Sequence, residues 1–238
     1  MNIMRRLTIL LCMMAWLTSL AQKQKTIEFF LSGTSQAAFD LEQVDSIVWL
    51  HNQVTPSDTV LADSDAIDLG LSVCWASHNI GAEKPQDYGY YLSWGESAPK
   101  DIYNDYTYLY GGELANTDIT ATDYDPARKL WGSGWRMPTY DECRELADAC
   151  TWEWCNTEGV NGMRVTGPNG NSIFLPAGGF PNAGGWNRVG TYGTYWTGTN
   201  ASSYTACYFR FDSGMHDVTD WDGAKYVGQL VRPVRAKR

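Results

Sequence analysis

Histidine is scarce in this sequence. Its 238 residues include only His51, His78 and His216, and none of them lies at a spacing that indicates a metal-binding pair or the base of a nucleophile. The G-x-S-x-G turn that presents a nucleophilic serine is also missing. We therefore predict a protein without catalytic residues, bound metal or other cofactors.

Cysteine patterns that hold metals are missing as well. Cys12 lies in the first apolar run, and the other five, Cys74, Cys143, Cys150, Cys155 and Cys207, form no C-x-x-C pair and no zinc spacing. Cys143 and Cys150 are seven positions apart on an expected helix, about 10 Å along its axis, which is too far for a disulfide. We expect most of the five to be buried thiols. An odd number leaves at least one of them unpaired in a monomer.

Basic residues are fewer than acidic residues in this sequence. Lys and Arg number 18, against 27 Asp and Glu. Proteins that bind nucleic acid present a basic stripe, and anionic lipid surfaces attract basic segments, so the composition argues against both partners. Acidic and aromatic side chains together are common in sugar-binding grooves, but an acidic exported protein is also simply soluble.

The longest apolar run, residues 7–17, is too short for a membrane span. Two arginines precede it at positions 5 and 6, and a small-x-small site follows, which together indicate a secretory signal peptide over residues 1–21, cleaved after Ala21. An uncleaved N-terminal anchor is the alternative. We expect a secreted, periplasmic or cell-surface protein with no membrane insertion after cleavage. Removing the signal takes away both arginines and no acid, which leaves 16 basic and 27 acidic residues and a formal charge of −11.

The chain after the signal is expected to contain two parts. Residues 22–65 indicate a short β segment and a polar linker, with a strand at 27–31, a turn at 32–35 and a second apolar set at 39–49. Residues 66–238 form the main domain. Its strands are predicted at 67–76, 88–95, 151–154, 163–166, 172–175, 191–197, 204–211 and 227–235, and its loops at 100–122, 176–190 and 212–223.

Two helices are expected in the first half of this domain. Asp125 is an N-cap followed by proline, and Gly132 ends that helix. Thr139 and Glu142 form a capping box for a second helix, and Arg136 before it is expected to bind backbone or an acid. The apolar face of the second helix holds Cys143, Leu146, Ala147 and Cys150. The sum is an α+β fold of mostly short antiparallel strands, with one or two helices in the first half and long loops.

The stretch from residue 178 onward is rich in the aromatic and amide side chains that binding surfaces use. It lacks the lysine and the strand–helix context of a phosphate-binding loop. The candidate ligand contacts are Trp186, Asn187, Arg188, Tyr192, Asn200, Tyr204 and Trp221, with core positions for half of these aromatics as the alternative. Asp217, Asp220 and Asp222 offer oxygen ligands, but their spacing does not match a helix–loop–helix calcium site, so we expect a solvated acidic turn.

Four runs carry a family resemblance: D-L-G-L-S-V-C-W-A from Asp68, Y-G-Y-Y-L-S-W-G-E from Tyr88, W-G-S-G-W-R-M-P-T from Trp131 and V-T-G-P-N-G-N-S-I-F-L-P-A from Val165. Over residues 66–235 the chain resembles the Fibrobacter succinogenes major paralogous domain family of exported Bacteroidetes proteins. The resemblance implies a C-type-lectin-like domain, related to the formylglycine-generating sulfatase-modifying fold. In that fold an R-x-P-T segment opens a helix, and an arginine-bearing strand closes the domain beside the first strand.

The family's enzymatic and calcium signatures are missing from this chain. It has neither the reactive cysteine pair and G-N-V-W-E-W run of the generating enzymes nor the E-P-N and W-N-D runs of calcium-dependent lectins. Relatives of the fold diversify loops near the C-terminus for recognition, and residues 186–226 occupy the matching place. The resemblance therefore implies an exported or surface-associated, non-catalytic binding protein whose loops at 184–226 recognise a glycan or protein.

Two other functions stay open. One is a hydrolase or modifying enzyme that uses Asp217, Asp220 or Asp222 in an aromatic cleft. The other is a structural subunit of a surface assembly, which donates its N-terminal strands to a neighbour's sheet edge.

Overall fold

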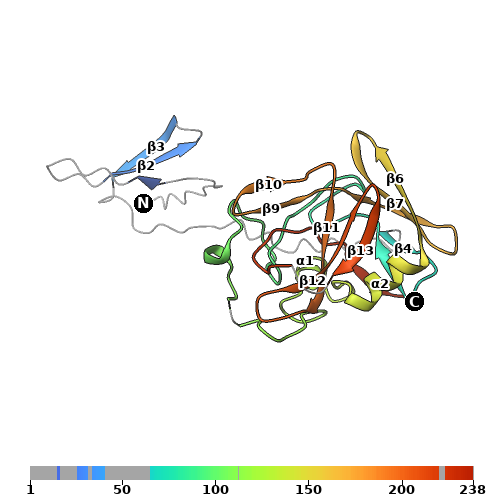
Figure 1. Cartoon of the computed structure of the whole chain (residues 1–238). Helices are drawn as coiled ribbons and strands as arrows, with labels where there is room; N and C mark the ends of the chain where they lie inside the picture. The colour runs from blue at the N-terminus through green and yellow to red at the C-terminus, as the bar shows by residue number, and fades with distance from the viewer. Residues whose placement is uncertain are drawn as a thin grey trace, which may run out of the picture. The chain divides into compact units, whose positions relative to one another are not determined.

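The computed structural model describes residues 15–16, 26–31, 34–40, 65–111, 113–219 and 223–237 (Figure 1). The chain divides into two compact units, residues 1–55 and 56–238. No helix in the described ranges is long and apolar enough to cross a membrane. Most of the expected signal peptide and the expected linker before Asp65 lie outside the described residues.

The first unit contains one antiparallel sheet with the strand order β1-β2-β3. Its strands are β1 (Ala15–Trp16), β2 (Thr26–Leu31) and β3 (Thr34–Asp40). β2 confirms the strand expected at 27–31, whereas β3 begins inside the expected turn at 32–35. Residues 41–49 of the second apolar set lie outside the described residues. β1 falls within the segment attributed to the signal peptide, which stays a prediction.

The second unit begins with a hairpin, where a single strand was expected at 67–76. β4 (Ala66–Asp68) and β5 (Val73–Ala76) pair antiparallel. The chain turns between them because Gly70 has a φ of +83° and donates its N–H to Oδ1 of Asp68 over 2.7 Å. β14 (Val234–Ala236) pairs with the other edge of β5. The last strand thus closes the unit beside the first hairpin, as the resemblance implies.

Residues 88–95 are hydrogen-bonded but do not form the expected strand. Leu92 and Gln229 form an isolated antiparallel bridge, and the N–H of Trp94 donates to the carbonyl of Lys225 over 2.8 Å. Leu230 forms a further bridge with Tyr195. Residues 225–230 therefore form hydrogen bonds with several different segments and make no continuous strand. Of the strand expected at 227–235, only the end is observed, as part of β14.

Two helices lie where the capping signals place them: α1 (Pro126–Trp131) and α2 (Tyr140–Ala149). Asp125 caps α1, and Gly132 ends it with a φ of +86°. Thr139 and Glu142 form the expected capping box of α2. Arg136 donates to both carboxylate oxygens of Glu142, over 2.7 and 2.5 Å, which confirms that it binds an acid.

The rest of the second unit is antiparallel sheet. β6 (Thr151–Thr157), β7 (Val160–Thr166) and β8 (Ser172–Pro176) form a meander that includes the expected hairpin around 167–171. β11 (Gly193–Asn200), β12 (Ala206–Asp212) and β13 (Met215–Thr219) form a second three-stranded sheet. Two helices and mostly antiparallel strands make the fold α+β.

Two stretches expected to be loops contain strands. The stretch 176–190 holds the hairpin β9 (Phe180–Asn182) and β10 (Gly185–Asn187), whose turn is closed by Asn182 accepting from the N–H of Gly184. The stretch 212–223 holds β13, which follows a turn where Asp212 accepts from two backbone N–H groups. In both cases a short polar side chain stabilises the turn of a hairpin. The polar composition that indicated a loop therefore belongs to the turn.

The core consists of two apolar clusters. In the larger one, Cys143 and Leu146 of α2 are grouped with Phe209 and Phe211 of β12, and α2 covers the sheet of β11, β12 and β13. The smaller cluster includes Trp94, Trp196 and Met137. Tyr195 and Trp196 are neighbours in β11 and belong to the larger and the smaller cluster respectively, so β11 is anchored in both.

Candidate functional site

The candidate contact residues fall into two groups at opposite ends of β11. Gly193, at its start, forms a parallel bridge with Gly179, next to the β9–β10 hairpin that carries Trp186 (Figure 1). Asn200, at its end, adjoins the turn that carries Tyr204. Its eight residues span about 23 Å at ~3.3 Å per residue, so a small ligand cannot touch both groups. Trp221 lies outside the described residues.

Trp186 is the centre of the first group. Trp186 is 64 % exposed, and its ring meets the ring of Tyr91 edge-on, with centroids 4.7 Å apart and an interplanar angle of 84°. Tyr91 is buried, and its hydroxyl donates to the carbonyl of Gly178 over 2.7 Å. Burial, followed by the neighbouring tyrosines, raises the pKa of Tyr91 well above its usual value, so this hydroxyl keeps its proton. The exposed indole therefore rests on a fixed, buried ring.

The neighbours of Trp186 are ordered by contacts within the hairpin. Asn187 donates through Nδ2 to Oδ1 of Asn182 and to the carbonyl of Gly185, over 3.1 and 2.8 Å. Arg188 has a φ of +57°, and its guanidinium lies 3.9 Å from the centroid of the Tyr192 ring. Tyr192 is itself buried. The ring of Tyr192 packs against the guanidinium of Arg188. Tyr192 would therefore position Arg188 and would not contact a ligand itself.

The second group is built around a buried lysine. Nζ of Lys225 donates to Oδ1 of Asn200 over 2.6 Å, and to the carbonyls of Leu114 and Ser202 over 2.7 and 2.8 Å. Lys225 is 1 % exposed. Burial lowers its pKa to about 8, which leaves the ammonium form dominant at neutral pH. This cation ties three chain segments together at the end of β11. Tyr204, in the turn beyond Asn200, is 79 % exposed.

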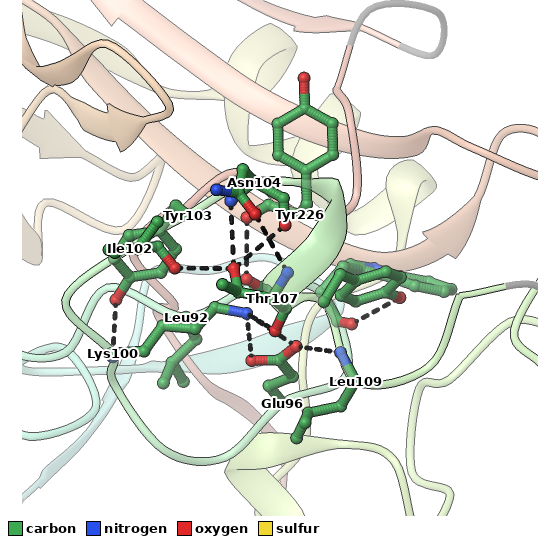
Figure 2. Close-up of polar contacts among 12 residues, drawn as sticks. Leu92, Glu96, Lys100, Ile102, Tyr103, Asn104, Thr107, Leu109 and Tyr226 are labelled. Atoms are coloured by element: carbon green, nitrogen blue, oxygen red, sulfur yellow. Dashed lines mark hydrogen bonds and ion pairs between the residues drawn. The ribbon is translucent and has the colours of Figure 1, made fainter. Parts of the chain in front are cut away.

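The segment expected to be a surface loop at 100–122 is closely hydrogen-bonded, as Figure 2 shows. The carboxylate of Glu96 is buried, accepts from the N–H of Leu109 over 2.8 Å and pairs with Lys100 over 2.8 Å. Nζ of Lys100 also donates to the carbonyl of Thr107 over 2.8 Å. The short helix η3 (Asp105–Thr107) is capped by Asn104. These bonds fix a segment that has no periodic pattern.

This segment presents apolar residues that sequence reasoning missed. Ile102, Tyr106 and Leu109 are all exposed, Tyr106 to 98 %. Tyr103 of the same segment and Pro181 of β9 both lie against the backbone of Gly228, which places Tyr103 near the hairpin. The only sequence signal was that the exposed apolar residues interrupt a polar stretch.

The acids and histidines considered for chemistry have structural contacts. Asp217 pairs with Arg144 and Arg210 over 3.6 and 3.9 Å. The ring of His216 stacks on Trp152 at 4.7 Å, and Nδ1 of His78 lies 2.8 Å from Oγ of Ser77. Asp220, Asp222 and His51 lie outside the described residues. Within the described ranges, no three His, Cys, Asp or Glu side chains are grouped as a metal ion would require.

Comparison with known proteins does not add to this geometry. A scan against protein-family models, a search of curated proteins and a search of solved structures each find no match to the chain.

Proposed function

We propose that the chain is an exported or surface-associated, non-catalytic binding protein with a C-type-lectin-like domain, and that its glycan or protein ligand contacts the β9–β10 hairpin. The observation that carries this proposal is Trp186, an exposed indole supported by the buried ring of Tyr91. Binding hot spots are enriched in tryptophan, tyrosine and arginine. A ring that is already fixed loses little conformational entropy when a ligand covers it.

The backbone of Arg188 supports the same surface. A non-glycine residue in the left-handed region costs about 1–2 kcal/mol, and the φ of Arg188 is +57°. Such conformations persist where the surroundings impose them and are concentrated at binding sites. In this conformation the guanidinium of Arg188, two positions after Trp186, lies over the ring of Tyr192.

The hydrolase alternative has less support. Asp217 is the one member of the acidic trio within the described residues, and its carboxylate pairs with Arg144 and Arg210. The pairing of this carboxylate with two guanidiniums favours a structural role over proton transfer.

The proposal is tested by measuring binding to glycan and protein arrays with the wild type and with Trp186→Ala. We expect the affinity for at least one ligand found to fall at least about tenfold, because a central aromatic contact is lost. The melting temperature should stay nearly unchanged, since the ring is exposed. Tyr204→Ala is the matched control: it removes another exposed ring at the far end of β11 and should leave affinity within about twofold. Equal binding by wild type and Trp186→Ala would refute the proposal.

A further inference from the structure

A cleft of about 490 Å³ opens at the end of β11 that lies away from the hairpin. Four segments line it: Asp118 of the segment 100–122, Tyr140 and Asp141 of α2, Thr199 and Asn200 of β11, and Cys207 of β12. Its volume lies within the range of small-molecule sites, about 300–1,000 Å³.

Hydrogen bonds between these segments hold the cleft open. The N–H of Tyr140 donates to Oγ1 of Thr199 over 3.0 Å. The N–H of Asn200 donates to Oδ1 of Asp118 over 2.7 Å. Because each bond joins two walls, the cleft exists before any ligand arrives, and binding requires little reorganisation.

The buried lysine determines which way the Asn200 amide faces. An ammonium group only donates hydrogen bonds, so the atom of Asn200 that lies 2.6 Å from Nζ of Lys225 must be the oxygen. This contact leaves Nδ2 of Asn200 as a donor, and no described residue accepts a hydrogen bond from it. Lys225 is thus a positioning residue that keeps one amide donor at the edge of the cleft.

Acceptors line the same cleft as this donor. The capping box of α2 uses Thr139 and Glu142 and does not involve Asp141. No group within residues 65–111, 113–219 and 223–237 bonds to the carboxylate of Asp141. Asp118 uses Oδ1 for the backbone of Asn200 and retains its second oxygen. Tyr140 adds an aromatic ring to the same lining.

We propose that this cleft binds a neutral sugar, with Asn200 donating to one hydroxyl and Asp141 accepting from the same or the adjacent hydroxyl. A hydroxyl both donates and accepts, so it satisfies an amide donor and a carboxylate acceptor together. An anion would face Asp118 and Asp141, and a cation would face the N–H groups of Asn200. The site lies at the opposite end of β11 from Trp186 and does not depend on the hairpin surface.

The test follows backbone amide resonances of Tyr140, Asn200 and Ala201 in ¹⁵N-labelled protein titrated with glucose, galactose, mannose, maltose and cellobiose. At least one of these sugars should shift all three resonances with a millimolar Kd. Glucuronic acid should bind at least about fivefold more weakly than glucose, because its carboxylate lies near Asp141. Asp141→Asn should remove most of that difference.

Asn200→Asp is the decisive variant. It keeps an oxygen against Lys225, so the fold is preserved, and it replaces the Nδ2 donor with an acceptor. We expect sugar affinity to fall at least about tenfold. Asn116→Asp makes the same change at an exposed position outside the lining of the cleft and should have no effect. The proposal is overturned if no neutral sugar shifts these resonances, or if Asn200→Asp binds sugar as tightly as wild type. It is also overturned if glucosamine binds more than tenfold better than glucose in both the wild type and Asn200→Asp.

Discussion

Arg232 donates from Nε to Oδ1 of Asn79 over 2.7 Å, across 153 positions of sequence, and both side chains are fully buried. The rest of the guanidinium donates to the carbonyls of Ala76, Ser77 and Phe174, over 2.9 to 3.0 Å. One arginine next to the last strand thus satisfies backbone groups beside β5 and on β8. Burial lowers its pKa to about 10, yet it stays charged at neutral pH.

The first prediction concerns this buried contact. Asn79→Ala leaves Nε of Arg232 without an acceptor and should lower the free energy of unfolding by about 1–3 kcal/mol, measured by urea titration. Asn171→Ala is the control, because its Nδ2 also donates to a carbonyl, that of Asp68, but in an exposed turn. It should cost less than about 1 kcal/mol. Equal losses in the two variants would show that burial of Arg232 does not matter.

The second prediction concerns pH. Burial raises the pKa of Glu142, but the hydrogen bonds from Arg136 and Thr139, together with the charge of Arg136, outweigh burial, so the net pKa lies below the usual value of 4.5. A carboxyl with a lowered folded-state pKa contributes stability that is fully present above its unfolded-state pKa and is lost as the pH falls through the folded-state value. The wild type should therefore lose stability in acid faster than Glu142→Gln does.

This difference is measured by urea unfolding of both proteins between about pH 3 and pH 7. The stability gap between wild type and Glu142→Gln should be widest above pH 4.5 and should narrow below it. Glu153→Gln, which removes an exposed acid 3.5 Å from Arg164, should show almost no gap at any pH. A gap for Glu142→Gln that stays constant with pH would contradict the assignment of its ion pair.

The third prediction concerns the thiols. Cys143 and Cys207 are buried on facing surfaces of α2 and β12, and burial raises the pKa of Cys143 well above its usual value. A thiol that is both covered and protonated reacts slowly. N-ethylmaleimide should therefore leave both unlabelled in the native protein while it labels the half-buried Cys155.

Peptide mapping by mass spectrometry distinguishes these sites. Both buried thiols should become labelled once urea unfolds the chain without reductant. Native labelling of Cys143 as fast as Cys155 would mean that α2 opens locally. Resistance to labelling in urea would mean that Cys143 is oxidised.

The local parts of this fold could be predicted from the sequence. Thr139 and Glu142 specify the start of α2, and Asp125 and Gly132 specify the bounds of α1, because each cap needs only residues a few positions apart. Strands that depend on distant partners were predicted less well. The segment 88–95 bonds to residues 225–229, and no local pattern contains that pairing.

The candidate sites show the same division. Trp186 and Asn200 were recognised by residue type, but their separation by the length of β11 is a property of the sheet. The cleft combines Asp118, Asp141 and Asn200, which lie tens of positions apart, and the orientation of its donor is set by Lys225. Residue chemistry indicates what a surface contacts, whereas tertiary pairing decides which residues share it.

The exposed indole of Trp186, held against Tyr91, should also report ligand binding at the hairpin through its fluorescence. Trp186 is the exposed tryptophan among those with described side chains, whereas Trp75, Trp94, Trp135 and Trp196 are enclosed by apolar neighbours. Among the tryptophans with described side chains, Trp186 should emit at the longest wavelengths and be quenched first by iodide. A ligand on the hairpin would shield that emission, but a sugar at the far end of β11 would leave it unchanged, so one cuvette experiment separates the two surfaces.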